Sequence, residues 1–480
     1  MELPGGTLIQ GAPVPVWAAL PFFLLLLGIA VVPLVSKHWW DRFYPVVSIG
    51  LGVITAAYYI VIRAAPLPIL NSEIQFISFI ALVGSLYVIA GGIHIRLRGR
   101  SRPLTNVAFL AFGALMANLI GTTGASMILI RPFIRVNRYR IKAFHIVFFI
   151  FIVSNMGGAL TPIGDPPLFL GYLRGIPFFW VLGSSWHIWL IAMGTILGIF
   201  FVIDARVYAG LSPAQRHRTE DVGERGEITG LHNLFFLAVV LFAVFVVDPP
   251  FVREGLMLAA ALGSWFTTPG EIHAKNDFDF VPIKEVAILF LGIFTTMVPA
   301  LGWIEQNSAA LGFRVAGQFY WATGALSSVL DNAPTYLNFF SAAVGVFVDP
   351  DLVRDVSRLL HESAPGLITL ASDVSSQARD TLDTLLKYHA ESAAAGTLTV
   401  DQMTTACLMT SHPVVVQAIS LAAVFFGAVT YIGNGPNLMV KSIAEQSGVQ
   451  CPSFGAYVGR YSFPILLPTF ALIWYIFFRS

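Results

Sequence analysis

Long apolar runs, separated by short polar segments, recur along almost the whole chain. A helix that crosses the hydrocarbon core of a bilayer needs roughly 20 mostly apolar residues. Only 11% of the 480 residues are charged and 56% are hydrophobic, whereas about a quarter of the residues in a soluble domain are charged. The predicted spans cover residues 16–35, 43–62, 74–93, 143–170, 186–203, 233–247, 255–266, 285–301, 414–440 and 462–478. The sequence therefore predicts an all-α polytopic membrane protein.

Charge and cysteine content exclude other classes. The formal net charge of +1 gives no reason to expect a nucleic-acid partner. Cys407 and Cys451 lack the spacing of metal ligands or of a disulfide framework, so both are predicted to be structural. The first apolar run is longer than a signal-peptide core and follows no basic segment, so we expect it to remain as a span.

The basic loops orient the chain, because short cytoplasmic loops carry an excess of Lys and Arg. Lys37 with Arg42, the arginines of 96–102, and residues 131–142 form three such loops. Residues 104–130 have a cytoplasmic loop at each end, which predicts a re-entrant hairpin that turns at 121–124. Each arm would have about 13 residues, or roughly 20 Å of helix, too short for a core of about 30 Å. The alternative is one helix with a face of small residues for packing.

The second half is predicted to have the opposite orientation. Residues 206–231 form a cytoplasmic connector, and the second hairpin, 319–348, enters from outside and turns at 330–334. A polar, mainly acidic insertion at 349–405 then lies outside and carries two short amphipathic helices. Both termini are expected to be extracytoplasmic in a bacterial-type inner membrane.

A duplicated motif supports two repeats. Residues 158–167 align without gaps with 427–436, and six of the ten positions are identical. The predicted organisation is a first repeat (14–205, with a broken helix at 143–171) and a second repeat (232–348 and 406–480, with a broken helix at 414–440). Each repeat has three spans, a hairpin and two further spans. Inverted repeats with broken helices are a recurrent architecture of secondary transporters.

Glycine and proline in these motifs predict a binding site. They interrupt backbone hydrogen bonding, which lipid tolerates only where the backbone is buried in protein or lines a cavity. Exposed carbonyl, hydroxyl and amide oxygens at such breaks can replace the hydration shell of Na+. The predicted helix breaks are Gly164, Pro166, Pro167, Gly433, Gly435 and Pro436. The predicted coordinating residues are Thr122, Thr123, Ser126, Ser154, Asn155, Thr161, Asn332, Thr335, Thr430, Asn434 and Asn437.

Asp165 and Asp331 are the predicted carriers of a proton or a cation. A carboxylate at membrane depth is costly and marks a functional site by default, and a proton and Na+ can compete for it. The alternative is that both residues cap half-helices. Arg131 and Lys441 are possible contacts of an anionic substrate, or else positive-inside anchors. His145 is expected to be a helix-packing or interfacial residue.

The segments 154–158, 161–167 and 330–335 resemble the ion transporter superfamily. Over nearly the whole chain apart from the insertion, the sequence is most similar to the group named for citrate transporters and for NhaD-type sodium:proton antiporters. The resemblance implies two hairpins, two broken helices, coupling to Na+ or protons, and a homodimer. The serine-asparagine-threonine hairpin signature of the dicarboxylate branch is replaced here by 122–124 and 331–333.

These features predict a secondary active transporter that works by alternating access, with sodium/proton antiport first and coupled citrate or carboxylate transport as the alternative. A membrane enzyme is disfavoured, because the ten His residues show no paired-ligand spacing. A passive channel fits the breaks, but two acidic sites in an inverted repeat favour transport. No cofactor is expected beyond Na+ or H+ as coupling ions, and the partners are the bilayer and small ions.

Overall fold

The computed structural model describes residues 13–96, 101–220, 227–246, 251–276, 278–307, 310, 312–362 and 375–479. The predicted arginine-rich loop, the connector 206–231, the end of the span 233–247 and the insertion lie partly outside these ranges. Within them the fold is almost entirely helical, and the only strands are β1 (His94–Arg96) and β2 (Glu227–Thr229), which pair antiparallel with His94 opposite Thr229.

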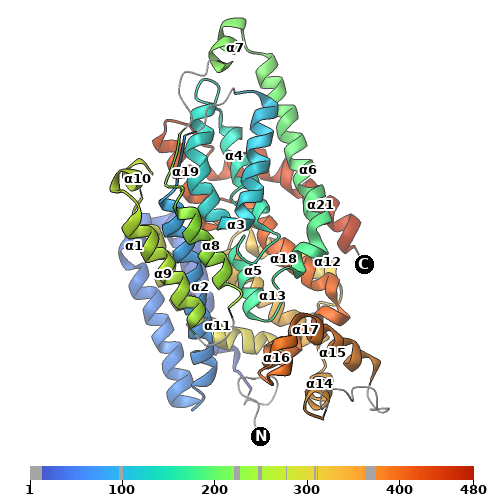
Figure 1. Ribbon diagram of the computed structural model, residues 1–480. Helices are drawn as coiled ribbons and strands as arrows, with labels where there is room; N and C mark the ends of the chain where they lie inside the picture. The colour runs from blue at the N-terminus through green and yellow to red at the C-terminus, as the bar shows by residue number, and fades with distance from the viewer. Residues whose placement is uncertain are drawn as a thin grey trace.

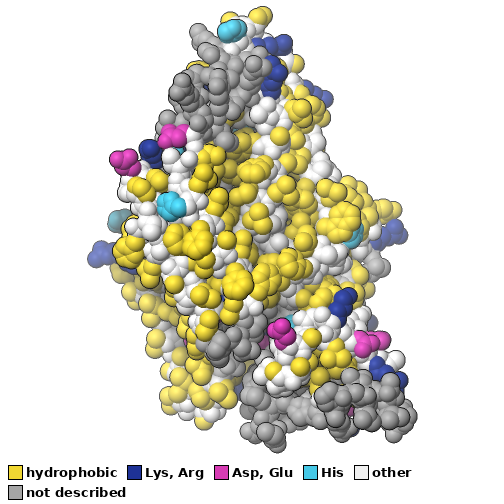
Figure 2. Space-filling view, in the orientation of Figure 1, with side chains coloured by type: hydrophobic (Ala, Val, Ile, Leu, Met, Phe, Trp, Pro, Cys, Tyr) yellow, Lys and Arg dark blue, Asp and Glu magenta, His cyan; other side chains and the backbone are white. Residues whose placement is uncertain are grey.

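Apolar helices form the bulk of the molecule, which confirms the prediction of an all-α polytopic membrane protein. Seven helices among the described residues are long and apolar enough to cross a membrane, or nine if each of two sharply bent pairs is one span. The prediction of ten spans is higher because 143–170, 233–247 and 255–266 correspond to shorter helices. Hydrophobic side chains cover the centre of the face shown in Figure 2, and charged ones gather at its edges.

The first two predicted spans lie in one folded-back element, α1 (Leu20–Ala57), which follows a 3-10 helix, η1 (Val16–Ala19), and continues into a π-helix, η2 (Tyr58–Ile62). Ser36 has non-helical backbone angles within α1. The rings of Trp17 and Tyr58 lie 5.0 Å apart, so the two ends of the element meet. The break therefore separates two antiparallel spans at the predicted cytoplasmic turn.

A group of helices lies beside α1 (left in Figure 1). It contains α2 (Leu67–Gly91), α8 (Asn233–Ala243), α9 (Val252–Thr267), α10 (Gly270–Lys275) and α11 (Val281–Asn307). Ser48 on α1 donates to the carbonyl of Ile288 on α11 at 2.8 Å, and Ser85 on α2 donates to that of Met257 on α9 at 2.9 Å. Small hydroxyl side chains thus let these helices pack closely.

The helix α3 (Pro103–Val136) is a hairpin and not one straight helix. Gly121 at its centre has φ 77° and ψ 154°, a conformation that is essentially restricted to glycine. The two ends of α3 meet, because Ser101 donates to Asn137 at 2.5 Å and the rings of Phe109 and Phe133 lie 5.2 Å apart. The break places residues 121–124 at the tip.

The second hairpin consists of α12 (Ala316–Ser327) and α13 (Asn332–Phe347). The rings of Phe319 and Phe347 lie 5.8 Å apart, so the helices run antiparallel. The connection comprises residues 328–331 and not the predicted 330–334. It ends earlier because the side chain of Asp331 accepts the N–H of Ala333 and begins α13 there, and the first turn of a helix tolerates Pro334.

Both predicted broken helices are interrupted. The first consists of α4 (Ala143–Ile152), the 3-10 turn η3 (Met156–Gly158) and α5 (Pro166–Leu173), followed by α6 (Trp180–Ala209). The second consists of α18 (Pro413–Phe426), the 3-10 turn η5 (Gly427–Val429) and α19 (Gly435–Gln446). The chain then ends in a continuous rod of α20 (Phe454–Tyr457), η6 (Val458–Leu466), α21 (Leu467–Ile473) and η7 (Trp474–Phe478), of which η6 and η7 are π-helical.

The insertion is a small helical unit with a core of its own. Its helices are α14 (Pro350–Glu362), α15 (Ser376–Tyr388), α16 (Ala390–Ala394) and α17 (Val400–Ser411), whereas the sequence predicted two. Val356, Leu382, Leu385 and Met403 are buried together in that core. The insertion lies at the opposite end of the molecule from α7 (Pro213–Glu220) in Figure 1.

Buried polar residues tie the base of the α3 hairpin to α6. The Arg140 guanidinium pairs with the Asp204 carboxylate, and both side chains are at most 1% exposed. Asn106 donates to Asp204 at 2.9 Å, and the ring of His145 lies 3.2 Å from the same carboxylate. Of the two roles expected for His145, helix packing or an interfacial position, the buried ring fits helix packing, and its acidic partner was not predicted.

Candidate functional site

Asp165 lies where four separate elements meet. It is the N-cap residue of α5 and is only 1% exposed. Its carboxylate accepts hydrogen bonds from Thr122 Oγ1 at 2.6 Å, from Asn434 Nδ2 at 3.2 Å, and from Asn332 Nδ2. These partners come from the tip of α3 and from the starts of α19 and α13, so both halves of the sequence contribute to one buried point.

Helix termini supply the electrostatic environment of this carboxylate. Asp165 and Asn434 are the N-cap residues of α5 and α19, and Asn332 is the first residue of α13. The N-terminus of a helix carries a partial positive charge and unpaired N–H groups. Three such termini close to Asp165 offset part of the cost of burying its carboxylate.

Three asparagines join the two breaks directly. Asn155 Nδ2 donates to Asn437 Oδ1 at 2.7 Å, and Asn434 Nδ2 lies 3.3 Å from Asn155 Oδ1. Asn437 in turn donates to the carbonyls of Gly427 and Thr430, both at 2.9 Å. Backbone oxygens that lack helical partners at the second break are thereby satisfied.

The two breaks share one local construction. Thr161 Oγ1 donates to the carbonyl of Asn118 at 2.6 Å and accepts the N–H of Gly164 at 3.1 Å. Thr430 Oγ1 likewise donates to the carbonyl of Ser328 at 2.6 Å and accepts the N–H of Gly433 at 3.1 Å. Each threonine thus fastens its break to the neighbouring hairpin.

Gly164→Ala is expected to disrupt the first break, because a Cβ at this position would overlap the carbonyl of Gly158. Backbone atoms on both sides cannot rotate away, so we expect a loss of about 3 kcal/mol or more. Gly435→Ala is the matched control from the second motif, since nothing lies within 4 Å of a Cβ there. Thermal unfolding in detergent should show a lower midpoint for Gly164→Ala alone; equal midpoints would contradict the crowding.

Asp331 does not contact Asp165 through a hydrogen bond; its neighbour Asn332 does. The half-buried Asp331 side chain accepts the Ala333 N–H at 3.1 Å and caps α13, which is the alternative role considered from the sequence. Thr335 donates to the Asp331 carbonyl at 3.0 Å within the same turn. The two hydroxyls of Ser126 and Ser154 lie 2.8 Å apart near the first break.

Arg131 and Lys441 lie away from the carboxylate. Arg131 follows Thr122 by nine residues on the same arm of α3, or roughly 13 Å of helix, and Lys441 follows Asn434 by seven, or roughly 10 Å. The Lys441 ammonium pairs with Glu445 at 3.2 Å and lies 5.4 Å from the centre of the Tyr431 ring.

Asn118 is a site residue that the sequence interpretation missed. Its Nδ2 donates to the carbonyl of Gly157 at 2.6 Å, and its Oδ1 accepts the N–H of Leu160 at 3.0 Å. An amide within the apolar stretch 107–120 of α3, three residues before Gly121, was the available signal. Asn332 Oδ1 is buried and accepts no hydrogen bond within the described part of the chain.

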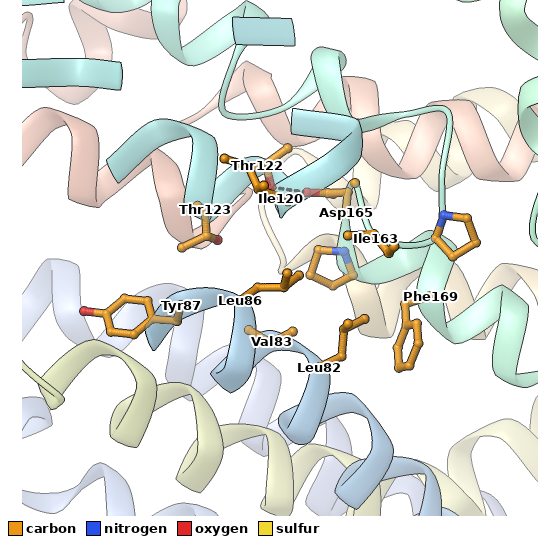
Figure 3. A pocket seen from close by; sticks show the side chains of 15 residues that line it. Leu82, Val83, Leu86, Tyr87, Ile120, Thr122, Thr123, Ile163, Asp165 and Phe169 are labelled. Atoms are coloured by element: carbon orange, nitrogen blue, oxygen red, sulfur yellow. Dashed lines mark hydrogen bonds between the residues drawn. The ribbon is translucent and has the colours of Figure 1, made fainter. Parts of the chain in front are cut away.

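A pocket reaches Asp165 from the side of α2. Figure 3 shows Leu82 and Leu86 of α2 facing the tip of α3 and the first break, with Thr122 directed at Asp165; Tyr87 of α2 lies at the edge of the pocket. The remaining lining comes from Val83, Phe169, and residues 120–124 and 162–166. Asp165 is the one charged residue among those that line the pocket.

Comparison with known families places the whole arrangement in context. Residues 11–478 match the family described as "Putative citrate transport". No curated protein matches the chain. The match covers nearly all of the sequence and agrees with the long apolar helices of the fold. The chain therefore belongs to this citrate transport family and is an integral membrane transporter.

Proposed function

We propose that the protein is a secondary active transporter that works by alternating access, with sodium/proton antiport as its reaction. The observation that carries this proposal is the buried carboxylate of Asp165, the one charged group lining the pocket, held by residues from both halves of the chain. A proton or Na+ neutralises such a carboxylate, and the two compete for it. Exchange of one for the other across the membrane follows from that competition.

The oxygen atoms near Asp165 suit Na+ as the transported ion. Thr122 Oγ1 and the unpaired Asn332 Oδ1 belong to side chains that touch this carboxylate. Hard cations prefer oxygen ligands, and a buried amide oxygen without a donor is costly unless something occupies it. We assign Asp165, Thr122 and Asn332 to the cation, and Asp331 to a second titrating role beside them.

We further propose that the two halves are inverted repeats. The matching hydrogen bonds of Thr161 and Thr430 support this assignment, as do the similar backbone angles of the N-cap residues Asp165 (φ −147°, ψ 146°) and Asn434 (φ −153°, ψ 139°). In this arrangement the insertion and the two termini lie outside a bacterial-type inner membrane, and the loop after α6 lies in the cytoplasm. We also propose a homodimer, which only the resemblance to the ion transporter superfamily supports.

Reconstituted protein tests the antiport. In proteoliposomes with an imposed pH gradient, addition of Na+ should dissipate the gradient, as a pH-sensitive dye reports, while K+ or choline should not. A pH gradient that is insensitive to Na+ would overturn sodium/proton antiport.

Coupled transport of citrate or a related carboxylate is the second candidate, and the family match favours it. The helix N-termini near Asp165 carry partial positive charge, which favours an anion there once a cation has neutralised the carboxylate. Uptake of labelled citrate in the same proteoliposomes distinguishes the candidates. Uptake that requires an inward Na+ or proton gradient supports symport, whereas a Na+-dependent proton flux without citrate supports antiport.

A further inference from the structure

The helical insertion holds the turn that ends α5 through three polar contacts, and its helix α17 also packs against α13. Thr405 Oγ1 on α17 donates to the carbonyl of Arg174 at 2.6 Å, and His389 Nε2 lies 3.0 Å from the carbonyl of Gly175. The Arg174 guanidinium lies 3.6 Å from the Asp401 carboxylate. Two backbone oxygens and one side chain of this turn are therefore held by the insertion.

The turn is shaped for this contact. Gly175 has φ +100°, and a Cβ added there would lie 2.8 Å from the Cα of Gln402 on α17. The N–H of Ile176 donates back to the carbonyl of Gly171 at 3.0 Å and closes the end of α5. Burial lowers the pKa of His389, so its neutral ring, with the proton on Nε2, is the form that donates to Gly175.

Asp165 and the turn at Arg174 lie at the two ends of the short helix α5. The helix α5 has eight residues, or roughly 12 Å of length. Pro166 and Pro167 occupy its first turn, where proline stiffens the backbone. A displacement of the Arg174 turn is therefore passed along α5 to the carboxylate.

The insertion is also continuous with the elements that supply two of the three partners of Asp165. It follows α13, which begins with Asn332, and it leads through α17 into α18 and the second break, which carries Asn434. The helices α17 and α18 meet at an angle of 105°. One unit thus connects α5, α13 and α18, although these helices belong to different halves of the chain.

We propose that the insertion is a positioning domain, which holds α5 against α13 and α19 so that Asp165 stays within reach of Asn332 and Asn434. Asp401, Thr405 and His389 are its positioning residues, and none of them touches the transported ion. This inference rests on the proposed ion site at Asp165. It assigns a role to an acidic segment that the sequence left without one.

Thr405→Val combined with Asp401→Asn tests the proposal, since valine keeps the shape of threonine and asparagine that of aspartate. We expect the apparent KM for Na+ to rise about threefold to tenfold, as the loss of two modest contacts predicts, while the maximal rate changes less than twofold. Thr405→Ser alone should keep the wild-type KM, because serine retains the hydroxyl that donates to the Arg174 carbonyl. Asp383→Asn, an exposed position on α15, is the matched control.

Hydrogen exchange of the amides of residues 168–173 gives a second reading that needs no transport. We expect these amides to exchange faster in the double variant than in the wild-type protein. In the control variant their exchange rates should not change, and the thermal midpoints of both variants should equal that of the wild type. Faster hydrogen exchange with an unaltered KM would contradict the claim that the insertion positions Asp165. Unaltered hydrogen exchange would contradict the claim that the insertion holds the end of α5. If the wild-type protein exchanges no Na+, the proposed function fails, and the exchange measurement alone then decides whether the insertion holds α5.

Discussion

Asp165→Asn is expected to abolish coupled proton flux while leaving the protein folded. Asparagine keeps the shape and the hydrogen-bonding capacity toward Thr122, but it can neither release a proton nor neutralise a cation. Loss of the carrier charge should lower Na+-driven proton flux at least 100-fold, since an interaction between a buried cation and a carboxylate is worth several kcal/mol. The measurement is dye-reported proton flux in proteoliposomes of the purified variant.

The control is a double variant in which the carboxylate moves from the first break to the second. Asn434 Nδ2 lies 3.2 Å from Asp165 Oδ1, so Asp165→Asn with Asn434→Asp returns one carboxylate to nearly the same point. We expect this double variant to recover part of the flux, and Asn434→Asp alone to impair it by placing two acids together. Wild-type flux in Asp165→Asn would remove Asp165 from the mechanism. Asp331→Asn, which still caps α13, shows separately whether the second acid takes part.

Asp204→Asn is expected to cause the largest loss of stability among single polar substitutions. It leaves the Arg140 guanidinium, only 1% exposed, without its counter-ion, and removal of one partner of a buried ion pair typically costs about 3–5 kcal/mol. The hairpin base should loosen with it, because Asn106 also bonds to this carboxylate. Chemical denaturation of the detergent-solubilised variant followed by circular dichroism measures the loss.

The matched control is Asp351→Asn, which breaks an ion pair with Arg354 at 2.6 Å on the surface of the insertion. Those side chains are 76% and 62% exposed, so we expect a change below about 1 kcal/mol. Replacing both Arg140 and Asp204 by leucine should cost less than Asp204→Asn, since no charge is then left buried. Equal stability of Asp204→Asn and the control would show that solvent reaches the buried pair.

Features that depend on local composition could be predicted from the sequence. Apolar length placed the chain in a membrane, and basic loops on both sides of 104–130 predicted that this segment turns back, as Gly121 does in the structure. Glycine and proline located both interruptions, since a helix loses its hydrogen bonds wherever they occur together. Asp165 followed as the acid at the first interruption.

Which side chains meet depends on the packing of the helices and could not be predicted from the sequence. Asn332 rather than Asp331 reaches Asp165 because the start of α13, not its cap, faces α5, and one residue along a helix changes the direction of a side chain by about 100°. The pairing of Arg140 with Asp204, 64 residues apart, and the grip of Thr405 on Arg174, 231 residues apart, have no local pattern in the sequence. Such contacts are set by how helices pack, and packing depends on the whole chain at once.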